Sequence, residues 1–207
     1  MEAPTSDNNA AVYIDNELVR RTRCGDVSAF EELFNRNQKR VYNIALQMLK
    51  DESEASDAAQ EVFVRAYQHI NTLKSDAAFV TWLKTMTINK CRDIIRKHGS
   101  NRTQSLDAPA EMNDGETLNR EVPDWSNNPE RSLDRKQTGE FVQKAIFSLS
   151  PDYREVVTLF YIDGADIAEI AKVLNCPIGT VKSRLSRARA ELKRKLEFYV
   201  KGEVGGS

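Results

Sequence analysis

Residues 166–196, DIAEIAKVLNCPIGTVKSRLSRARAELKRKL, carry the pattern that decides the predicted fold. Apolar residues at helical spacing predict a short amphipathic helix in the first part: Ile167, Ile170, Ala171 and Leu174. Asn175-Cys176-Pro177 ends this helix, because proline cannot continue the hydrogen-bond ladder. Thr180 can cap the next helix, whose apolar positions fall on one face: Val181, Leu185, Ala188 and Leu192. The stretch therefore predicts a helix-turn-helix.

The second of these helices is strongly basic, although the whole chain has a net charge of -1. Residues 182–189 contain four Lys or Arg side chains and no acid. A recognition helix presents its first turns to base edges in the major groove, while neighbouring cations contact phosphates. The alternative is a solvated basic face, for which interleaved acids are expected. The candidate DNA-binding residues are Thr180, Lys182, Ser183, Arg184, Ser186, Arg187 and Arg189.

Length and composition indicate a soluble globular protein. The 207 residues suffice for two small domains, and 40% hydrophobic with 29% charged residues is a typical globular balance. Because no apolar run approaches the roughly 18 residues of a membrane span and the start of the chain lacks a secretory pattern, we expect a cytoplasmic protein without membrane insertion. Cys24, Cys91 and Cys176 have no disulfide or metal spacing, so we expect reduced thiols.

The sequence divides into two helical blocks and a linker. Helical periodicity without strand alternation covers residues 12–98, with breaks expected at 51–53 and 71–76. Residues 99–131 combine Pro, Gly and polar residues with an excess of acids, which predicts a flexible acidic linker. Periodicity resumes over residues 132–200. The predicted fold is all-α, with two small helical domains joined by this linker.

A second basic helix is expected over residues 79–98, FVTWLKTMTINKCRDIIRKH. Its cations are Lys84, Lys90, Arg92, Arg96 and Lys97. Such a surface suits single-stranded or melted DNA, whereas Phe79 and Trp82 fit a core position better than an exposed one.

A polar helix face precedes it in residues 56–67, SDAAQEVFVRAY. Its members are Asp57, Gln60, Glu61 and Arg65, and they lie opposite the apolar positions Ala58, Val62 and Phe63. On the residues alone, this is an ordinary amphipathic surface helix.

Four segments in this order resemble the extracytoplasmic-function (ECF) sigma factors, the minimal two-domain promoter-recognition subunits of bacterial RNA polymerase. They are GDVSAFEELFNR (25–36), DAAQEVFVRAY (57–67), FVTWLKTMTINKCRDIIRK (79–97) and residues 149–192, LSPDYREVVTLFYIDG through the helix-turn-helix to RAEL. The resemblance implies two all-helical domains, sigma region 2 and sigma region 4. It covers nearly the whole chain except the linker and both tails.

The resemblance also implies roles for particular residues. Asp57, Gln60, Glu61 and Arg65 match the helix that docks on core RNA polymerase. The -10 element of promoter DNA would be bound by a loop, a base-reading asparagine and the cations of the basic helix: Asn71, Lys74, Ser75, Asp76, Lys84, Asn89, Lys90, Arg92 and Arg96. The candidate residues listed above for the helix-turn-helix match the helix that binds the -35 element. The linker would thread through polymerase, and an anti-sigma factor is the expected further partner.

Two other classes of function remain open from the sequence. A plain DNA-binding regulator also has a helix-turn-helix, but it gives the Asp57–Arg65 face and the acidic linker no purpose. A nucleic-acid enzyme would need more than the carboxylate pair of Asp57 and Glu61. We therefore expect a non-enzymatic initiation factor with no cofactor, no metal and no small-molecule substrate. Lys182 and Ser186 depart from residues found in the family, which leaves the promoter sequence open.

Overall fold

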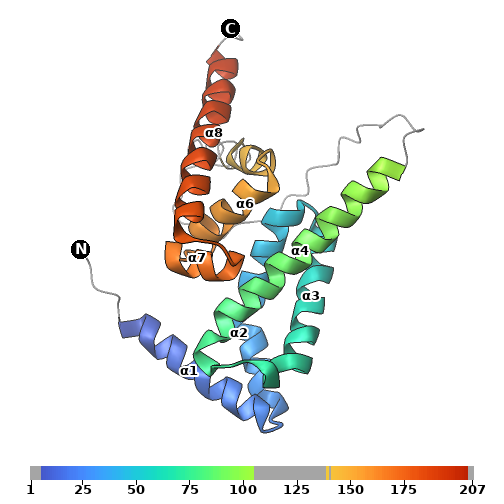
Figure 1. The fold of residues 1–207 in the computed structure, drawn as a ribbon, viewed down its shortest axis with the longest axis vertical. Coiled ribbons are helices and arrows are strands. Elements are labelled where there is room, and N and C mark those ends of the chain that lie inside the picture. The colour runs from blue at the N-terminus through green and yellow to red at the C-terminus, as the bar shows by residue number, and fades with distance from the viewer. Residues whose placement is uncertain (1–5, 105–138, 140, 205–207) are drawn as a thin grey trace, which may run out of the picture.

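The computed structural model describes residues 6–104, 139 and 141–204, and these residues form helices and no strand, so the all-α prediction is confirmed. The first half of the chain contributes α1 (Ser6–Arg23), α2 (Val27–Leu49), α3 (Glu52–His69) and α4 (Phe79–Gln104) (Figure 1). Two short 3-10 turns, η1 (Ile70–Thr72) and η2 (Asp76–Ala78), connect α3 to α4. The interruption between helices that was expected at 71–76 is therefore confirmed.

Aspartate caps start two of these helices. The Asp26 carboxylate accepts the Ala29 N–H at the start of α2, and the Asp51 carboxylate accepts the Glu54 N–H at the start of α3. Between them, Lys50 adopts a left-handed conformation with φ 67° and ends α2. The break expected at 51–53 therefore lies slightly earlier, because Asp51 already belongs to the cap of α3.

The core of the first half lies between its four α-helices. Val19, Leu33, Val62, Phe79 and Leu83 are among its buried side chains. Phe79 is a core residue, as predicted, and the half-buried Trp82 packs against the same cluster. Ala58, Val62 and Phe63 are all buried, which leaves the opposite face of α3 to solvent.

The second half builds the predicted helix-turn-helix. Residues 141–147 are helical and are followed by α6 (Pro151–Val157), the π-helical turn η3 (Thr158–Ile162), α7 (Ile167–Leu174) and α8 (Ile178–Val204). The turn between α7 and α8 begins with Asn175, whose left-handed conformation has φ 49°. Thr180 is not the cap of α8, because α8 already begins at Ile178 and the Thr180 N–H donates to the Pro177 carbonyl at 2.9 Å.

The two halves share one apolar cluster. It joins Ile44 and Met48 of α2 and Ile88 of α4 to Leu159 of η3 and Ile170 of α7. In Figure 1, α7 lies beside the middle of α4, in agreement with the contacts between these helices. Cys91 is buried in the same cluster, and this burial, together with the nearby charge of Glu155, raises the pKa of its thiol to about 12.

The expected domain boundaries stay predictions. Helix α4 continues to Gln104, beyond the boundary expected at residue 98. Residues 105–131 of the expected linker lie outside the described residues. Within the described part of the chain, no helix combines the length and the apolar character needed to cross a membrane.

Candidate nucleic-acid interface

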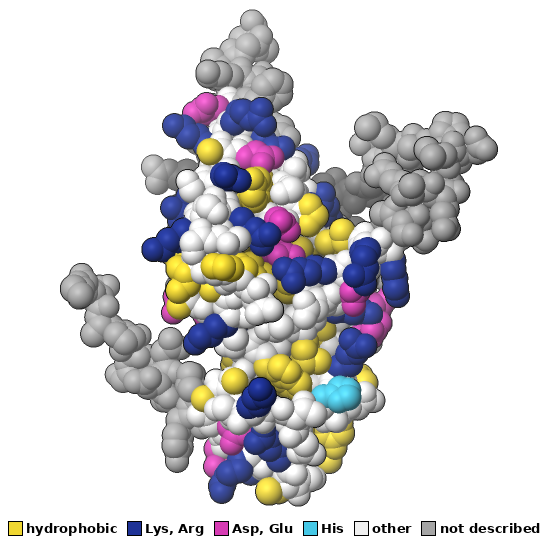
Figure 2. Space-filling view, viewed as in Figure 1, with side chains coloured by type: hydrophobic (Ala, Val, Ile, Leu, Met, Phe, Trp, Pro, Cys, Tyr) yellow, Lys and Arg dark blue, Asp and Glu magenta, His cyan; other side chains and the backbone are white. Residues whose placement is uncertain are grey.

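Helix α8 exposes one face and buries the other. Val181, Leu185 and Ala188 are buried, whereas the polar positions between them reach solvent. Five of the DNA-binding residues predicted on α8 are exposed: Lys182, Ser183, Ser186, Arg187 and Arg189. Dark blue Lys and Arg side chains accordingly lie over the upper part of the molecule, where Figure 1 places α8 (Figure 2). This face has the exposure and charge that a recognition helix requires.

Three of the predicted residues of α8 have partners inside the second half: Arg184, Arg189 and Thr180. Arg184 pairs with Asp152 of α6 at 2.7 Å. Arg189 donates to the Tyr161 hydroxyl at 2.7 Å, and its guanidinium lies 5.5 Å from the centre of the Phe160 ring. These contacts turn both arginines back toward their own half. Thr180 is half-buried, and its carbonyl accepts from the Ser183 hydroxyl.

The predicted -10 loop is held by a residue that the sequence did not single out. Arg23, at the end of α1, pairs with Asp76 at 2.7 Å and donates to the carbonyls of Ile70 and Leu73. With Leu73 buried beneath it, the loop presents its remaining predicted side chains to solvent: Asn71, Lys74 and Ser75. Arg23 lies 50 residues before Leu73, so no local pattern in the sequence signals the contact.

Four of the five predicted cations of α4 pair with acids, and two of these four do so within the first half. Lys90 pairs with Glu61 of α3, and Arg96 pairs with Asp93 one turn earlier at 2.9 Å. Asn89 is exposed between them, and its amide oxygen accepts from Arg92 at 3.4 Å. These residues lie at or near the surface, where exposed ion pairs contribute little stability and are readily exchanged for others.

Lys84 and Arg92 differ, because both contact the second half. Lys84 is 5% exposed and pairs with Asp163 and Glu169. Arg92 makes two hydrogen bonds of 2.6 Å to the carboxylate of Glu155, a residue that is 1% exposed. The hydrogen bonds to Glu155 raise the pKa of Arg92. In this arrangement, Lys84 cannot contact DNA.

The polar face of α3 is open to solvent. Asp57, Gln60, Glu61 and Arg65 are all exposed and lie on the side of α3 away from the core. The hydrogen bond from Lys90 lowers the pKa of Glu61, and the charges of Arg65 and Lys97 act in the same direction. Because cations surround Glu61, its carboxylate is poorly suited to binding a metal ion with Asp57.

Comparison with known proteins identifies the two halves separately. The family model described as Sigma-70 region 2 matches residues 33–101, and the model described as Sigma-70, region 4 matches residues 142–192.

Curated relatives match along most of the chain. The RNA polymerase sigma-H factor of Pseudomonas aeruginosa is 32% identical over 185 residues, which cover 88% of this chain and 94% of the relative. The ECF RNA polymerase sigma factor SigW of Bacillus subtilis is 33% identical over 178 residues, covering 86% and 94%.

Two solved structures have a similar fold. CnrH, in complex with the cytosolic domain of CnrY, matches with a TM-score of 0.64 and 24% identity, covering 89% of this chain and 97% of that one. The sigma factor RpoE from Bartonella quintana, in complex with the anti-sigma factor NepR, matches with a TM-score of 0.65 and 23% identity, covering 83% and 98%.

Proposed function

Since this chain belongs to the ECF sigma factors of RNA polymerase and directs transcription, we propose that its two halves recognise the two elements of a promoter. The exposed face of α8 binds the -35 element in the major groove. The melted -10 element is bound by the loop at 71–76 and by five residues of α4: Lys84, Asn89, Lys90, Arg92 and Arg96. The polar face of α3 docks on core polymerase. The observation that carries the proposal is the exposed row of Lys182, Ser183, Ser186 and Arg187 on a helix whose opposite face is buried.

The same proposal covers partners and chemistry. The chain acts in the cytoplasm as an initiation factor and has no catalytic activity of its own. An anti-sigma factor controls it, a proposal supported by the solved RpoE structure, which contains the anti-sigma factor NepR. In vitro transcription with core polymerase and a promoter library tests the function directly. Promoter-specific transcripts are expected only when the chain is added, and transcription without promoter preference would refute the proposal.

We expect Arg187→Ala to weaken binding to the preferred -35 element by about 1–3 kcal/mol and to relax sequence preference at one position. Arg187 is exposed on the side of α8 away from its buried residues, where a guanidinium can bind a guanine edge. Lys193→Ala is the matched control. The Lys193 side chain is 79% exposed and lies further along the helix. Its loss should weaken all sequences alike and reduce the salt dependence by about one phosphate contact.

Fluorescence titration of matched and scrambled -35 duplexes at several salt concentrations separates the two effects. An equal loss of affinity for both duplexes in Arg187→Ala would contradict base recognition by this residue.

Asn89→Ala is expected to reduce promoter opening more than closed-complex binding. The Asn89 side chain is exposed on α4, and its amide offers both a donor and an acceptor to a base edge. A flipped base becomes available only after melting, so the amide contributes at that step. Permanganate footprinting measures opening, and gel shift of the polymerase complex measures closed binding. Equal defects in both measurements would indicate a purely structural role for Asn89.

A further inference from the structure

A short acidic segment, residues 155–169, faces the basic surface of the first half. It contains four acids and no Lys or Arg. Three of these acids form ion pairs with α2 and α4: Glu155 with Arg92, Asp163 with Arg40 and Lys84, and Glu169 with Lys84. The fourth, Asp166, caps α7 by accepting the Glu169 N–H. The segment therefore presents carboxylates to cations that the proposed function assigns to DNA.

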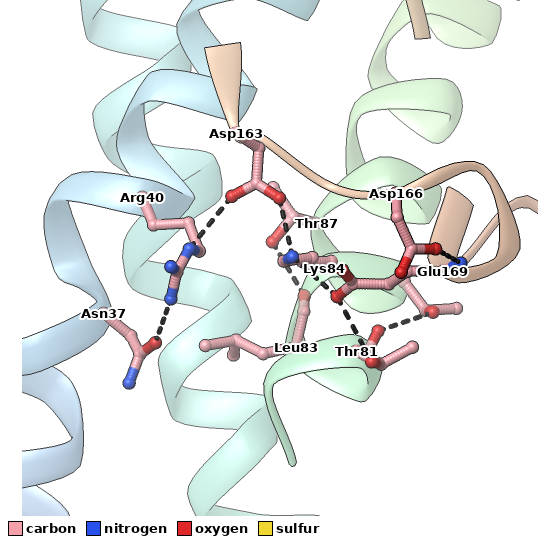
Figure 3. Close-up of polar contacts among 10 residues, drawn as sticks. Asn37, Arg40, Thr81, Leu83, Lys84, Thr87, Asp163, Asp166 and Glu169 are labelled. Atoms are coloured by element: carbon pink, nitrogen blue, oxygen red, sulfur yellow. Dashed lines mark hydrogen bonds and ion pairs between the residues drawn. The ribbon is translucent and has the colours of Figure 1, made fainter. Parts of the chain in front are cut away.

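The densest part of this contact surrounds Lys84. Figure 3 shows Asp163 and Glu169 approaching the Lys84 ammonium from the second half, with Arg40 on the other side of Asp163. The Lys84 Nζ lies 2.6 Å from Asp163 Oδ2 and 2.7 Å from Glu169 Oε1. The Arg40 Nε lies 2.9 Å from Asp163 Oδ1. Short charge-assisted contacts of this kind are also those that a lysine makes with phosphate oxygens.

The contact between Arg92 and Glu155 has the same character. Arg92 Nε donates to Glu155 Oε1 and Arg92 Nη2 donates to Glu155 Oε2, each at 2.6 Å. This two-pronged geometry is the one that arginine uses for carboxylates and phosphates alike. Glu155 therefore occupies a binding position that a DNA phosphate would need.

The backbone of the second half holds Asp163 in place. The π-helical turn η3 ends just before it, and the Asp163 N–H donates to the Thr158 carbonyl at 3.0 Å. The next residue, Gly164, has φ +75°, a conformation that favours glycine. The chain can thus turn sharply into α7 while the aspartate points at α2 and α4 (Figure 3).

We propose that the acidic segment is an autoinhibitory contact, in which Glu155, Asp163 and Glu169 take the place of DNA phosphates against Lys84 and Arg92. The second half must leave α2 and α4 before these cations can bind the melted strand. The inference rests on the DNA role proposed above for Lys84 and Arg92. The polar face of α3 stays exposed in the closed arrangement, so the contact blocks DNA and leaves polymerase access open.

The test opens the contact by removing two charges without changing side-chain size, in the variant Asp163→Asn/Glu169→Gln. The lysine is then left buried without a carboxylate, which favours separation of the halves. Glu31→Gln/Glu32→Gln is the matched control, because it removes two exposed carboxylates from α2. Small-angle scattering of the full chain measures opening as an increase in the radius of gyration. Circular dichroism checks helical content, and Glu155→Gln replaces the first variant if that content falls.

A fluorescent single-stranded DNA oligonucleotide of random sequence measures the consequence. The open variant is expected to bind it about tenfold or more tightly, because apparent affinity scales with the fraction of binding-competent molecules. Adding Lys84→Ala should remove this gain, whereas the control pair should neither expand nor gain affinity.

An unchanged radius of gyration in the Asp163→Asn/Glu169→Gln variant would refute the proposal that these contacts hold the two halves together. Expansion without a gain in affinity would show that Lys84 and Arg92 do not bind DNA. It would then refute the claim that the acidic segment blocks a DNA-binding surface. Transcription by the wild-type chain with core polymerase tests the proposed function separately. Its absence would refute that function whatever the scattering shows.

Discussion

Arg154→Ala is expected to lower the free energy of unfolding by about 3–5 kcal/mol, because three carbonyls lose a charged donor at once. Arg154 is 6% exposed, and its guanidinium donates to Met48 O at 2.8 Å, Phe147 O at 2.9 Å and Leu149 O at 2.9 Å. Met48 lies at the end of α2, where carbonyls lack helical partners and favour a cation. One side chain thus joins the end of a first-half helix to the start of the second half.

Denaturant unfolding followed by circular dichroism measures this loss. Arg154→Lys should lie between the wild type and the alanine variant, since an ammonium retains the charge but not the planar fork that reaches several carbonyls. Lys172→Ala serves as a control, because this exposed side chain should change stability by about 0.5 kcal/mol or less. A loss below that size in Arg154→Ala would mean that water satisfies the three carbonyls.

The sequence predicted the features that depend on neighbouring residues. The apolar spacing of Ile167 to Leu174 and the proline at 177 were sufficient for the helix-turn-helix. The polar side of α3 was predicted from the apolar positions of Ala58, Val62 and Phe63 in the same helix, and these three side chains are buried in the structure. Thr180 was assigned wrongly as a cap, because residue type alone did not reveal that the helix starts immediately after Pro177.

The sequence could not predict the contacts between the halves. Arg40 and Asp163 are 123 residues apart, and Lys84 and Glu169 are 85 apart. The sequence around Lys84 does not reveal whether this lysine is exposed or buried, because its burial depends on the second half, whose Glu169 follows 85 residues later in the chain. Glu155 likewise resembles a surface acid in residues 149–157, yet it is 1% exposed and pairs with Arg92. Long-range pairing of charges leaves no periodic signal in either partner.

Charge reversal at Asp57 and Glu61 is expected to weaken binding to core polymerase by about 2 kcal/mol or more, which is the usual cost of losing an interface hot spot. Both side chains are exposed on α3, so Asp57→Lys/Glu61→Lys should leave the helical content unchanged. The lost pair between Glu61 and Lys90 is a surface contact, worth about 1 kcal/mol or less. Glu31→Lys/Glu32→Lys reverses the same number of exposed charges on α2 and is the matched control. Fluorescence anisotropy with labelled core polymerase measures both variants. Wild-type affinity in the α3 variant would remove the docking role of this face, whereas an equal loss in the control would trace the effect to net charge alone.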